Sequence, residues 1–343
     1  MSTVLPPLVD EVALKGFLQK EVGQDGDLSI ERHQAGHSNE TFFVTYGGRE
    51  MVLRRPPRGA FLPTAHDVLR EYKVLSALND APVRSPRTIA ACDDESVIGA
   101  PFYLMERVRG VVIRTEWLSG YSEAEKRPVG EELVDALVEL HSIDPATYGM
   151  TGLGKPQGYL ERQLKRWTGQ MELTLPHTRP LPDLEEAGRW LVAHRPESPP
   201  ATVVHGDYKL DNVVFSETPP ARLLTILDWE MSTLGDPLAD LGWMISFWRE
   251  PGDEQDVFGD LNRVTAAPGF SKRDELVERY AAKTGLAVEG LDWYIVLAIW
   301  KLAILLEGSY ARHLAGMTDD PFFARMEEGV PALAARALGV AGT

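Results

Sequence analysis

The separation of strand-like from helix-like segments constrains the fold of this chain more than any other feature of its sequence. Short stretches rich in β-branched and aromatic residues cluster in the first third of the chain, at 28–33, 41–46, 50–55, 87–91 and 101–106. The pair Gly47-Gly48 between the second and third stretches is typical of a two-residue hairpin turn. Together with an inserted helical pattern at 66–78, these stretches predict a small antiparallel-sheet lobe over residues 1–106.

From residue 107 to residue 343 the pattern is mainly helical. Leu133, Ala136, Leu137 and Leu140 recur at helical spacing, and only residues 201–228 revert to short strands. Ser122 and Glu125 have the spacing of a capping box, whereas Pro128 favours a helix that begins near it with a separate turn ahead. We therefore expect an α+β fold with a second, larger and mainly helical lobe.

The opening helix is expected from Val9, Val12, Ala13 and Phe17, which recur at helical spacing before a glycine-rich break. In the helix at 66–78, the apolar face is expected to hold Leu69, Tyr72, Leu75 and Leu78, with Glu71 to its side.

Composition narrows the class of protein and of partner. The chain has 343 residues, of which 44% are hydrophobic and 25% charged, which excludes a disordered, collagen-like or coiled-coil protein. Its formal net charge of −16 disfavours nucleic acid and anionic membranes as partners. The apolar stretch 291–306 carries Asp292 and Lys301 and is expected to be a core helix, not a membrane span. The oligomeric state stays open.

The cellular compartment is expected to be the cytoplasm. A single cysteine, Cys92, cannot form an intramolecular disulfide and is typical of proteins from reducing compartments. Residues 1–10 also lack the basic and apolar regions of a signal peptide.

The segment most informative about chemistry is 203–215, in which two apolar strands surround a polar loop. Asp207 follows His205 by two positions, Asn212 follows Asp207 by five, and Asp228 ends another apolar strand sixteen residues later. A phosphoryl-transfer site needs one carboxylate to orient the attacking hydroxyl, and a second carboxylate and an amide oxygen for Mg²⁺. Asn212 and Asp228 taken singly are ordinary turn formers at strand ends, but the joint spacing favours such a site.

This pattern resembles the aminoglycoside phosphotransferase and choline kinase superfamily, whose fold is similar to that of protein kinases. The match extends through most of the chain and is strongest to the branch that also occurs as a kinase domain fused to acyl-CoA dehydrogenases. The motifs that carry it are Gly36-x-Ser38-Asn39-x-Thr41, Val52-Leu53-Arg54-Arg55-Pro56-Pro57, Leu227-Asp228-Trp229-Glu230 and Gly235-Asp236-Pro237-x-x-Asp240-Leu241-Gly242. The resemblance implies a bilobal protein-kinase-like fold and ATP- and Mg²⁺-dependent phosphorylation of a hydroxyl group on a small molecule.

The resemblance also implies roles for residues of the helical lobe. Asp207 would be the catalytic base, and Lys209 would contact the transferred phosphoryl group. Asn212 and Asp228 would hold Mg²⁺, and Asp240 would brace the backbone of the catalytic loop. The chain between Asp228 and Gly235 is too short for a protein-kinase activation segment, which argues against peptide substrates.

In the first lobe the resemblance implies an ATP site. The loop over the nucleotide phosphates would consist of Gly36, Ser38 and Asn39. Arg54 would contact the phosphates in place of the usual lysine, with Glu71 as its ion-pair partner, although Arg and Lys are not equivalent phosphate ligands. Backbone groups of the hinge would bind adenine, and the hinge residues are Met105, Glu106 and Val108.

The acceptor is less constrained by the sequence. A helix with basic and aromatic side chains near residue 160 could receive an anionic substrate such as a CoA ester, or could simply bury Leu160, Leu164 and Trp167 with its charges in solvent. The candidate substrate residues are Tyr159, Arg162, Gln163, Trp167, Glu230 and Arg312. A hydroxyacyl-CoA-like metabolite is favoured by the resemblance.

Other functions stay open. The charge of −16 would suit a cationic aminoglycoside, so an antibiotic kinase is one alternative. A non-catalytic nucleotide-binding module is a second, and a metallohydrolase using His205 and Asp207 is a third. His205 is expected instead to be a buried structural residue, and His141 a core residue or a partner of the helix dipole. Glu71 considered alone would be a solvated helix position.

Overall fold

The computed structural model describes residues 8–23, 25–33, 39–57, 67–253, 263–318 and 320–342, which form two compact units. The first comprises Met1–Arg109 and Thr225–Glu230, and the second comprises Gly110–Leu224 and Met231–Thr343. The sequence places the division after residue 106 and does not anticipate that the short segment Thr225–Glu230 joins the first unit.

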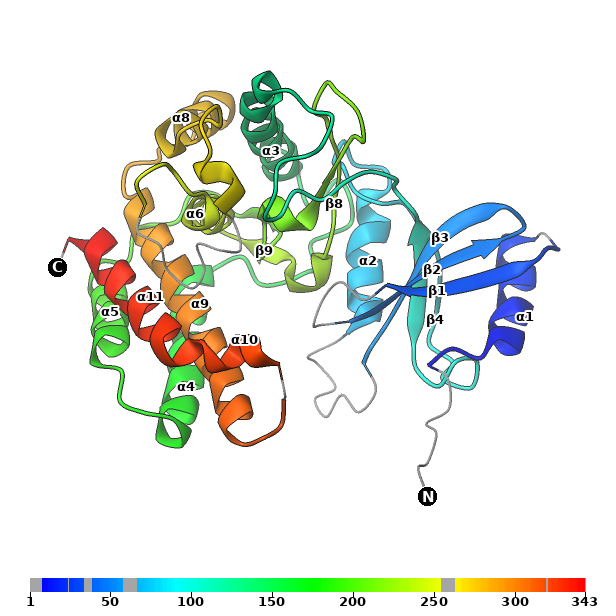
Figure 1. Cartoon of the computed structure of the whole chain (residues 1–343), viewed down its shortest axis with the longest axis horizontal. Helices are drawn as coiled ribbons and strands as arrows, with labels where there is room; N and C mark the ends of the chain where they lie inside the picture. The colour runs from blue at the N-terminus through cyan, green and yellow to red at the C-terminus, as the bar shows by residue number, and fades with distance from the viewer. Residues whose placement is uncertain are drawn as a thin grey trace. The chain divides into compact units, whose positions relative to one another are not determined.

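A five-stranded antiparallel sheet forms the first unit, with the strand order β1-β2-β3-β5-β4 (Figure 1). Its strands are β1 (Leu28–His33), β2 (Glu40–Tyr46), β3 (Arg49–Arg55), β4 (Thr88–Cys92) and β5 (Phe102–Glu106), each within one residue of the predicted stretch. Gly47 and Gly48 make the predicted turn with φ values of 55° and 81°, which side chains with a Cβ rarely adopt. The predicted small antiparallel sheet is therefore confirmed.

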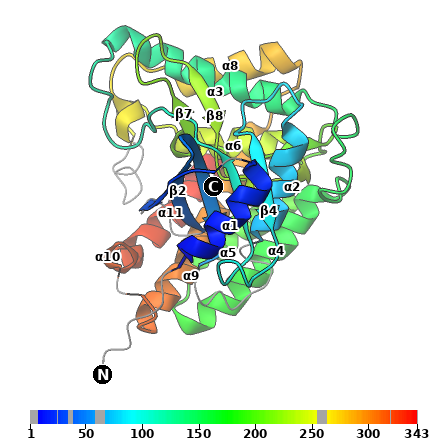
Figure 2. The ribbon, with the colours of Figure 1, turned by 90° about the vertical axis from the view of Figure 1, so that its right-hand side faces the viewer.

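Two helices contact opposite faces of β3. Met51 and Leu53 pack with Leu14 and Leu18 of α1 (Glu11–Val22), which lies in front of the sheet in Figure 2. Because side chains alternate along a strand, Arg54 points to the other face, where α2 (Val68–Leu78) lies.

Both predicted helix faces need correction. Val12 of α1 is 84% exposed, and α1 instead buries Leu14 and Leu18. In α2 the buried positions are Val68, Glu71, Val74, Leu75 and Leu78, so that Glu71 lies on the packed face and not beside it. Spacing alone does not decide between neighbouring helix faces, and packing against the sheet selects the buried one.

The second unit is mainly helical. Its helices are α3 (Lys126–His141), α4 (Tyr159–Thr174), α5 (Pro182–Ala193), α6 (Pro237–Phe247), α8 (Arg273–Thr284), α9 (Leu291–Leu314), α10 (Pro321–Ala324) and α11 (Met326–Ala341). Three short strands accompany them, namely β6 (Thr202–Val204), β7 (Val213–Phe215) and β9 (Thr233–Gly235), and β8 (Leu223–Ile226) leads from the second unit into the first. Strand β9, which pairs antiparallel with β6, is not predicted from the sequence.

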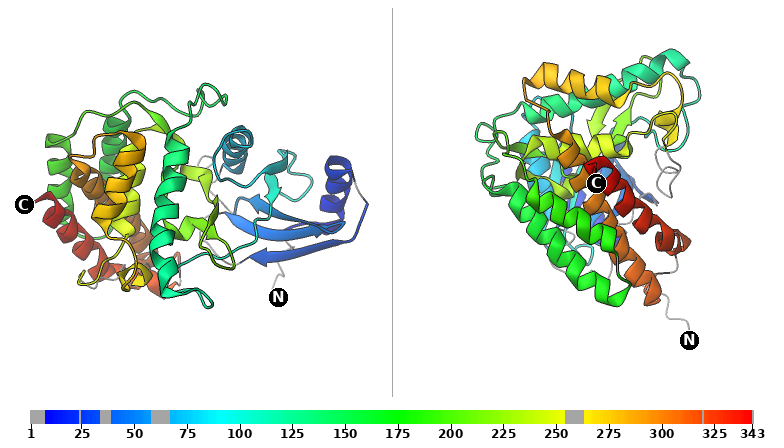
Figure 3. Two further views of the ribbon diagram at one scale, coloured as in Figure 1. Left: turned by 90° about the horizontal axis from the view of Figure 1, so that it is seen from above. Right: turned by 90° about the vertical axis from the view of Figure 1, so that its left-hand side faces the viewer.

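Helix α9 is the centre of the second unit. It contacts α4, α5, α6, α10 and α11, and α11 lies along it in Figure 3. By length and composition alone α9 could cross a membrane, yet 61% of its apolar window is buried inside the structure. This burial is what we expect of a core helix.

The start of α3 follows one sequence expectation and contradicts another. A separate 3₁₀ turn, Glu123–Glu125, precedes the helix, and Pro128 lies in the first turn of α3, where its missing N–H removes no intrahelical hydrogen bond. The Ser122 side chain makes no capping hydrogen bond, so the predicted capping box is wrong.

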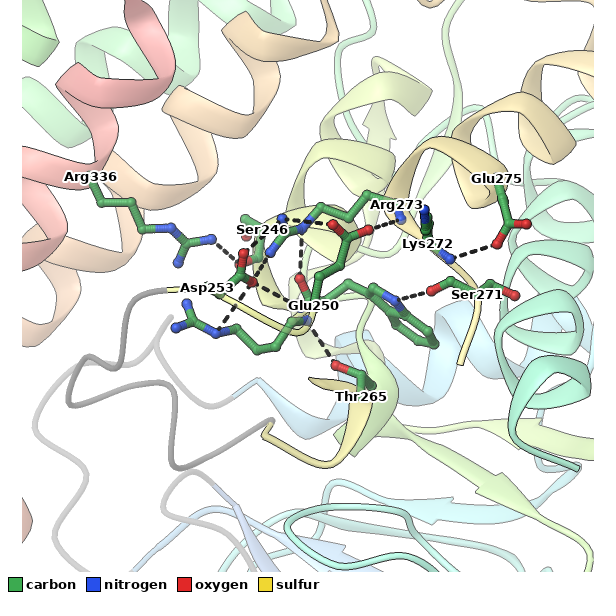
Figure 4. Close-up of polar contacts among 11 residues, drawn as sticks. Ser246, Glu250, Asp253, Thr265, Ser271, Lys272, Arg273, Glu275 and Arg336 are labelled. Atoms are coloured by element: carbon green, nitrogen blue, oxygen red, sulfur yellow. Dashed lines mark hydrogen bonds and ion pairs between the residues drawn. The ribbon is translucent and has the colours of Figure 1, made fainter. Parts of the chain in front are cut away.

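A polar network anchors the carboxyl end of α6 (Figure 4). Arg273, at the start of α8, donates to the backbone oxygen of Trp248 at 2.9 Å and to the carboxylate of Asp253. The indole of Trp248 donates in turn to the backbone oxygen of Ser271 at 2.9 Å. These contacts fix α6, whose other side chains reach the loop that carries Asp207.

Candidate active site

The carboxylate of Asp207 is held by neighbouring donors while staying 24% exposed. Trp243 Nε1 donates to its Oδ1 at 2.8 Å, and Asn212 Nδ2 donates to its Oδ2 at 2.8 Å. Lys209 Nζ lies 3.3 Å from Oδ1. An oriented and accessible carboxylate of this kind can accept a proton from a hydroxyl group.

Asp240, on α6, braces the backbone that precedes Asp207. Its Oδ2 accepts from the His205 N–H at 2.6 Å and its Oδ1 from the Gly206 N–H at 2.8 Å. Burial opposes ionisation, but the hydrogen bond and charge of His141 help to lower the pKa of Asp240. The expectation that Asp240 braces the loop is confirmed. Gly206 has a φ of 86°, and a Cβ there would lie 2.8 Å from the Met231 carbonyl oxygen, so the loop requires glycine.

Both histidines near this loop are structural. His205 is fully buried, and its Nδ1 accepts from the Asp207 N–H at 3.2 Å. His141 contacts Tyr280 at 2.7 Å and Asp240 at 3.2 Å. Within the described ranges no group of three or more His, Cys, Asp or Glu side chains could hold a metal ion. The metallohydrolase alternative thus gains no support from this loop.

The first unit contains a second charged cluster, centred on Arg54. Arg54 Nη1 lies 2.9 Å from Glu71 Oε1, and its Nη2 lies 3.1 Å from Asp228 Oδ1. Glu71 is 1% exposed and also accepts from the Trp229 N–H at 3.2 Å, so its interpretation as a solvated residue is wrong. Burial raises the pKa of Glu71 to about 7, against the opposing positive charge of Arg54. The ion pair of Arg54 and Glu71 is therefore present and buried.

The segment that carries Asp228 is strained and well anchored. Asp228 has a φ of 65°, in the left-handed region that few non-glycine residues occupy. Asn39 Nδ2 donates to Glu230 Oε2 at 3.0 Å, and Arg70 donates to the Glu230 backbone oxygen at 3.0 Å. Asn39 and Glu230 thus belong to one cluster, so the candidate substrate residue Glu230 lies beside a candidate nucleotide residue. Two other predicted loop residues, Gly36 and Ser38, lie outside the described residues.

Two of the predicted hinge residues, Met105 and Glu106, end β5, and Val108 follows the strand. Met105 is buried, Val108 is half-buried, and the exposed side chain of Glu106 lies 3.7 Å from Arg49. The Glu106 N–H already donates to the Arg87 carbonyl oxygen at 2.8 Å. An adenine contact through the remaining backbone groups stays a prediction.

The donor types of the predicted metal ligands fit Mg²⁺. The amide nitrogen of Asn212 donates to the Asp207 carboxylate at 2.8 Å and to the Asp207 backbone oxygen at 2.9 Å. The amide oxygen of Asn212 is therefore the atom suited to a cation. Asp228 offers a carboxylate that is 30% exposed. Carboxylate and amide oxygens are the hard ligands that Mg²⁺ prefers. The two residues belong to different units.

The candidate substrate residues of α4 and α9 divide into buried and exposed sets. Trp167 is buried, as the structural alternative expected, and its Nε1 donates to Gln163 Oε1 at 3.1 Å. Tyr159 is buried as well. Arg162 is exposed and donates to the backbone oxygens of Lys155 and Gln157, and Arg312 is exposed and donates to Ser309 Oγ at 2.9 Å.

A small cavity lies beside the Asp207 loop. Its volume is about 20 Å³, enough for one water molecule, and its polar lining comes from Tyr159, Gln163, Gly206, Asp240, Trp243 and Lys301. Trp243 and Lys301 are not among the site residues predicted from the sequence. Two signals could have found them: Trp243 follows Asp240 by three positions on one helix face, and Lys301 is a charge inside an apolar helix, which needs a partner.

A family model and curated relatives match most of this chain. The model of the APH family, described as the phosphotransferase enzyme family, matches residues 29–288. Acyl-CoA dehydrogenase family member 11 of chicken (Gallus gallus) is 35% identical over 311 residues, which cover 88% of this chain and 39% of the relative. The chain therefore spans about two fifths of the length of that relative.

Solved structures confirm the fold class. A crystal structure from Ralstonia eutropha JMP134, provisionally named an aminoglycoside phosphotransferase, is 32% identical with a TM-score of 0.84, covering 97% of this chain and 98% of the other. Choline kinase of Cryptosporidium parvum Iowa II has a TM-score of 0.67 at 11% identity, covering 97% and 96%, a likeness of fold alone. The expected α+β, bilobal, protein-kinase-like fold is confirmed.

Proposed function

Because the chain belongs to the APH phosphotransferase family, we propose that it transfers the γ-phosphoryl group of ATP, in the presence of Mg²⁺, to a hydroxyl group of a small molecule. Family and fold support the coarser activity, a small-molecule phosphotransferase. ATP, Mg²⁺ and the hydroxyl acceptor are the parts that the proposal adds.

The observation that carries the proposal is the state of Asp207. Its carboxylate is oriented at 2.8 Å by both Trp243 and Asn212, yet it is still 24% exposed. In the proposed reaction this carboxylate orients the acceptor hydroxyl and accepts its proton while the hydroxyl oxygen bonds to the γ-phosphorus and ADP leaves. Lys209, whose Nζ lies 3.3 Å from Asp207, would contact the transferred group.

The remaining residues would bind and orient the nucleotide. When bound, ATP supplies the phosphoryl group, and Mg²⁺ neutralises charge on its phosphates. Asn212 and Asp228 are the proposed Mg²⁺ ligands, and Arg54, fixed by Glu71, is the proposed phosphate contact. Gly36, Ser38 and Asn39 would cover the phosphates, and the hinge at Met105, Glu106 and Val108 would receive adenine.

For the acceptor we favour a hydroxyacyl-CoA-like metabolite. The support is the 35% identity to a domain of a protein named as an acyl-CoA dehydrogenase family member. A cationic aminoglycoside is the second candidate, favoured by the net charge of −16 and by the name of the Ralstonia protein.

The proposal is tested by ATP consumption with Mg²⁺ across hydroxyacyl-CoAs, aminoglycosides, choline and sugars. Wild type is compared with Asp207→Asn and with Asp211→Asn, which makes the same change in the same loop. We expect one acceptor class to support turnover, Asp207→Asn to lose about 100-fold or more while still binding ATP, and Asp211→Asn to stay within about threefold.

Turnover that survives in Asp207→Asn would contradict the assigned base. ATP binding by wild type without turnover on any acceptor would instead favour the non-catalytic nucleotide-binding module.

A further inference from the structure

One charged side chain of the helical core has no role in the reaction described so far. Lys301 lies in the middle of α9, a long and apolar helix. Its Nζ donates to the backbone oxygen of Gly206 at 3.0 Å. The same Nζ lies 4.3 Å from the centroid of the Trp243 ring and 5.7 Å from that of Trp167.

These contacts reach Asp207 by two separate routes. The Gly206 carbonyl belongs to the peptide group that joins Gly206 to Asp207, so the Lys301 hydrogen bond restrains the backbone that presents the carboxylate. Trp243, whose ring faces the ammonium, donates its indole N–H to Asp207 Oδ1 at 2.8 Å. A cation over an indole ring also restrains the ring orientation.

Stability alone is a poor reason for a lysine at this position. The neighbours Leu297, Ala298 and Ile304 are apolar and buried, and an apolar side chain would avoid the cost of desolvating an ammonium group. Burial lowers the pKa of Lys301 to about 8, against the opposing charges of Asp207 and Asp240. A residue that is costly to bury and that contacts the functional loop is typical of a site that trades stability for function.

We infer that Lys301 is a positioning residue for phosphoryl transfer, which holds the Asp207 carboxylate in its reactive orientation through the Gly206 carbonyl and the Trp243 indole. The inference rests on the proposed role of Asp207. The sequence does not predict this role, because Lys301, Trp243 and Gly206 are brought together only by the packing of α6 and α9 around the loop.

Hydrogen exchange tests the inference without any need for turnover. The amides of His205, Gly206 and Asp207 are hydrogen-bonded and report on the loop. In Lys301→Met we expect these amides to exchange at least about threefold faster than in wild type, and in Lys301→Arg to recover part of the protection. Lys20→Met, which replaces an exposed lysine of α1, is the matched control and should leave the loop unchanged.

Steady-state kinetics on the same proteins separate positioning from binding. With the acceptor found for wild type, Lys301→Met should lower kcat about tenfold and leave the KM for ATP within about twofold, with partial recovery in Lys301→Arg. Loop exchange equal to wild type in a folded Lys301→Met, or in Lys301→Gln if the methionine variant does not fold, would overturn the inference. Absence of turnover in wild type would instead contradict the proposed function and leave the exchange result to decide the role of Lys301.

Discussion

The charged clusters around Arg54 and around Asp207 differ in burial and in the kind of group that holds the carboxylate. In the first unit Arg54 and Glu71 are almost completely buried and form an ion pair at 2.9 Å, with Asp228 at 3.1 Å from Arg54. In the second unit Asp207 is held mainly by the neutral donors of Trp243 and Asn212 and stays partly exposed. The first arrangement fixes charges in place, whereas the second presents one carboxylate to an incoming group.

This difference predicts how each cluster fails. Removing one partner from a buried ion pair leaves an uncompensated charge and lowers stability. Removing a neutral donor from an exposed carboxylate leaves the fold intact and changes its orientation.

Within the first cluster the largest effect is expected at Asp228, the residue that is still 30% exposed. Asp228→Asn keeps a side chain that tolerates the left-handed backbone but removes the negative charge. At about 1 mM Mg²⁺, turnover should fall about 100-fold. The variant loses a negatively charged ligand of Mg²⁺ at the place where charge develops during phosphoryl transfer. Mg²⁺ titration of kcat is the measurement, and unchanged turnover at low Mg²⁺ would argue that Asp228 serves only Arg54.

The second effect contrasts a buried ion pair with an exposed one. Glu71→Gln should lower the free energy of unfolding by about 2 kcal/mol. This is less than the cost of removing the Glu71 side chain altogether, because the amide oxygen still accepts a hydrogen bond from Arg54. Glu50→Gln, which weakens the more exposed pairs with Arg107 and Arg109, should lower the free energy of unfolding clearly less than Glu71→Gln does. Urea unfolding compares the two variants, and equal costs would contradict the importance given to burial.

The third effect uses two tryptophans that each donate an indole hydrogen bond. Trp243→Phe removes the 2.8 Å contact to Asp207 and should lower kcat about tenfold. Trp248→Phe removes the 2.9 Å contact to the Ser271 carbonyl oxygen and should lower stability while leaving kcat within about twofold. Equal kcat values for the two variants would show that the Trp243 contact does not orient the carboxylate.

The smallest effect is a pH dependence of stability at Lys301. The groups that face its ammonium are Asp207, Asp240, Arg166 and Lys209. Its pKa falls from 10.5 to about 8 on folding, so the penalty on the buried ammonium is complete below pH 8 and fades as the pH rises toward 10.5. Relative to Lys301→Met, wild type should therefore gain stability as the pH rises from about 8 toward 10.5.

Urea unfolding of both proteins across this pH range gives the measurement. If the stability difference between the two proteins does not change with pH, burial does not lower the pKa of Lys301.

The sheet of the first unit could be predicted because its signals are local. The stretches 41–46 and 50–55 predict β2 and β3 from their residue types, and Gly47-Gly48 supplies the turn between them. The strand β9 was missed because it has only three residues and is defined by its pairing with β6. Its stability comes from a partner about thirty residues away along the chain, which no local pattern records.

The candidate site was predictable in part for the same reason. Asp207 and Asn212 lie within one loop, so their spacing in the sequence predicts that they belong to one site. The burial of Glu71 and the contacts of Trp243 and Lys301 with the loop depend on packing between elements far apart in sequence. Such contacts leave only weak traces in the sequence, such as a lysine within an apolar helix.

The most direct test of the account is to look for the phosphorylated product. Phosphorus NMR of wild type with ATP, Mg²⁺ and a hydroxyacyl-CoA should show a new phosphomonoester that grows as ADP forms, and Asp207→Asn should show none over the same time. ADP that accumulates with inorganic phosphate alone, across every acceptor offered, or a phosphomonoester that forms equally in Asp207→Asn, would contradict it.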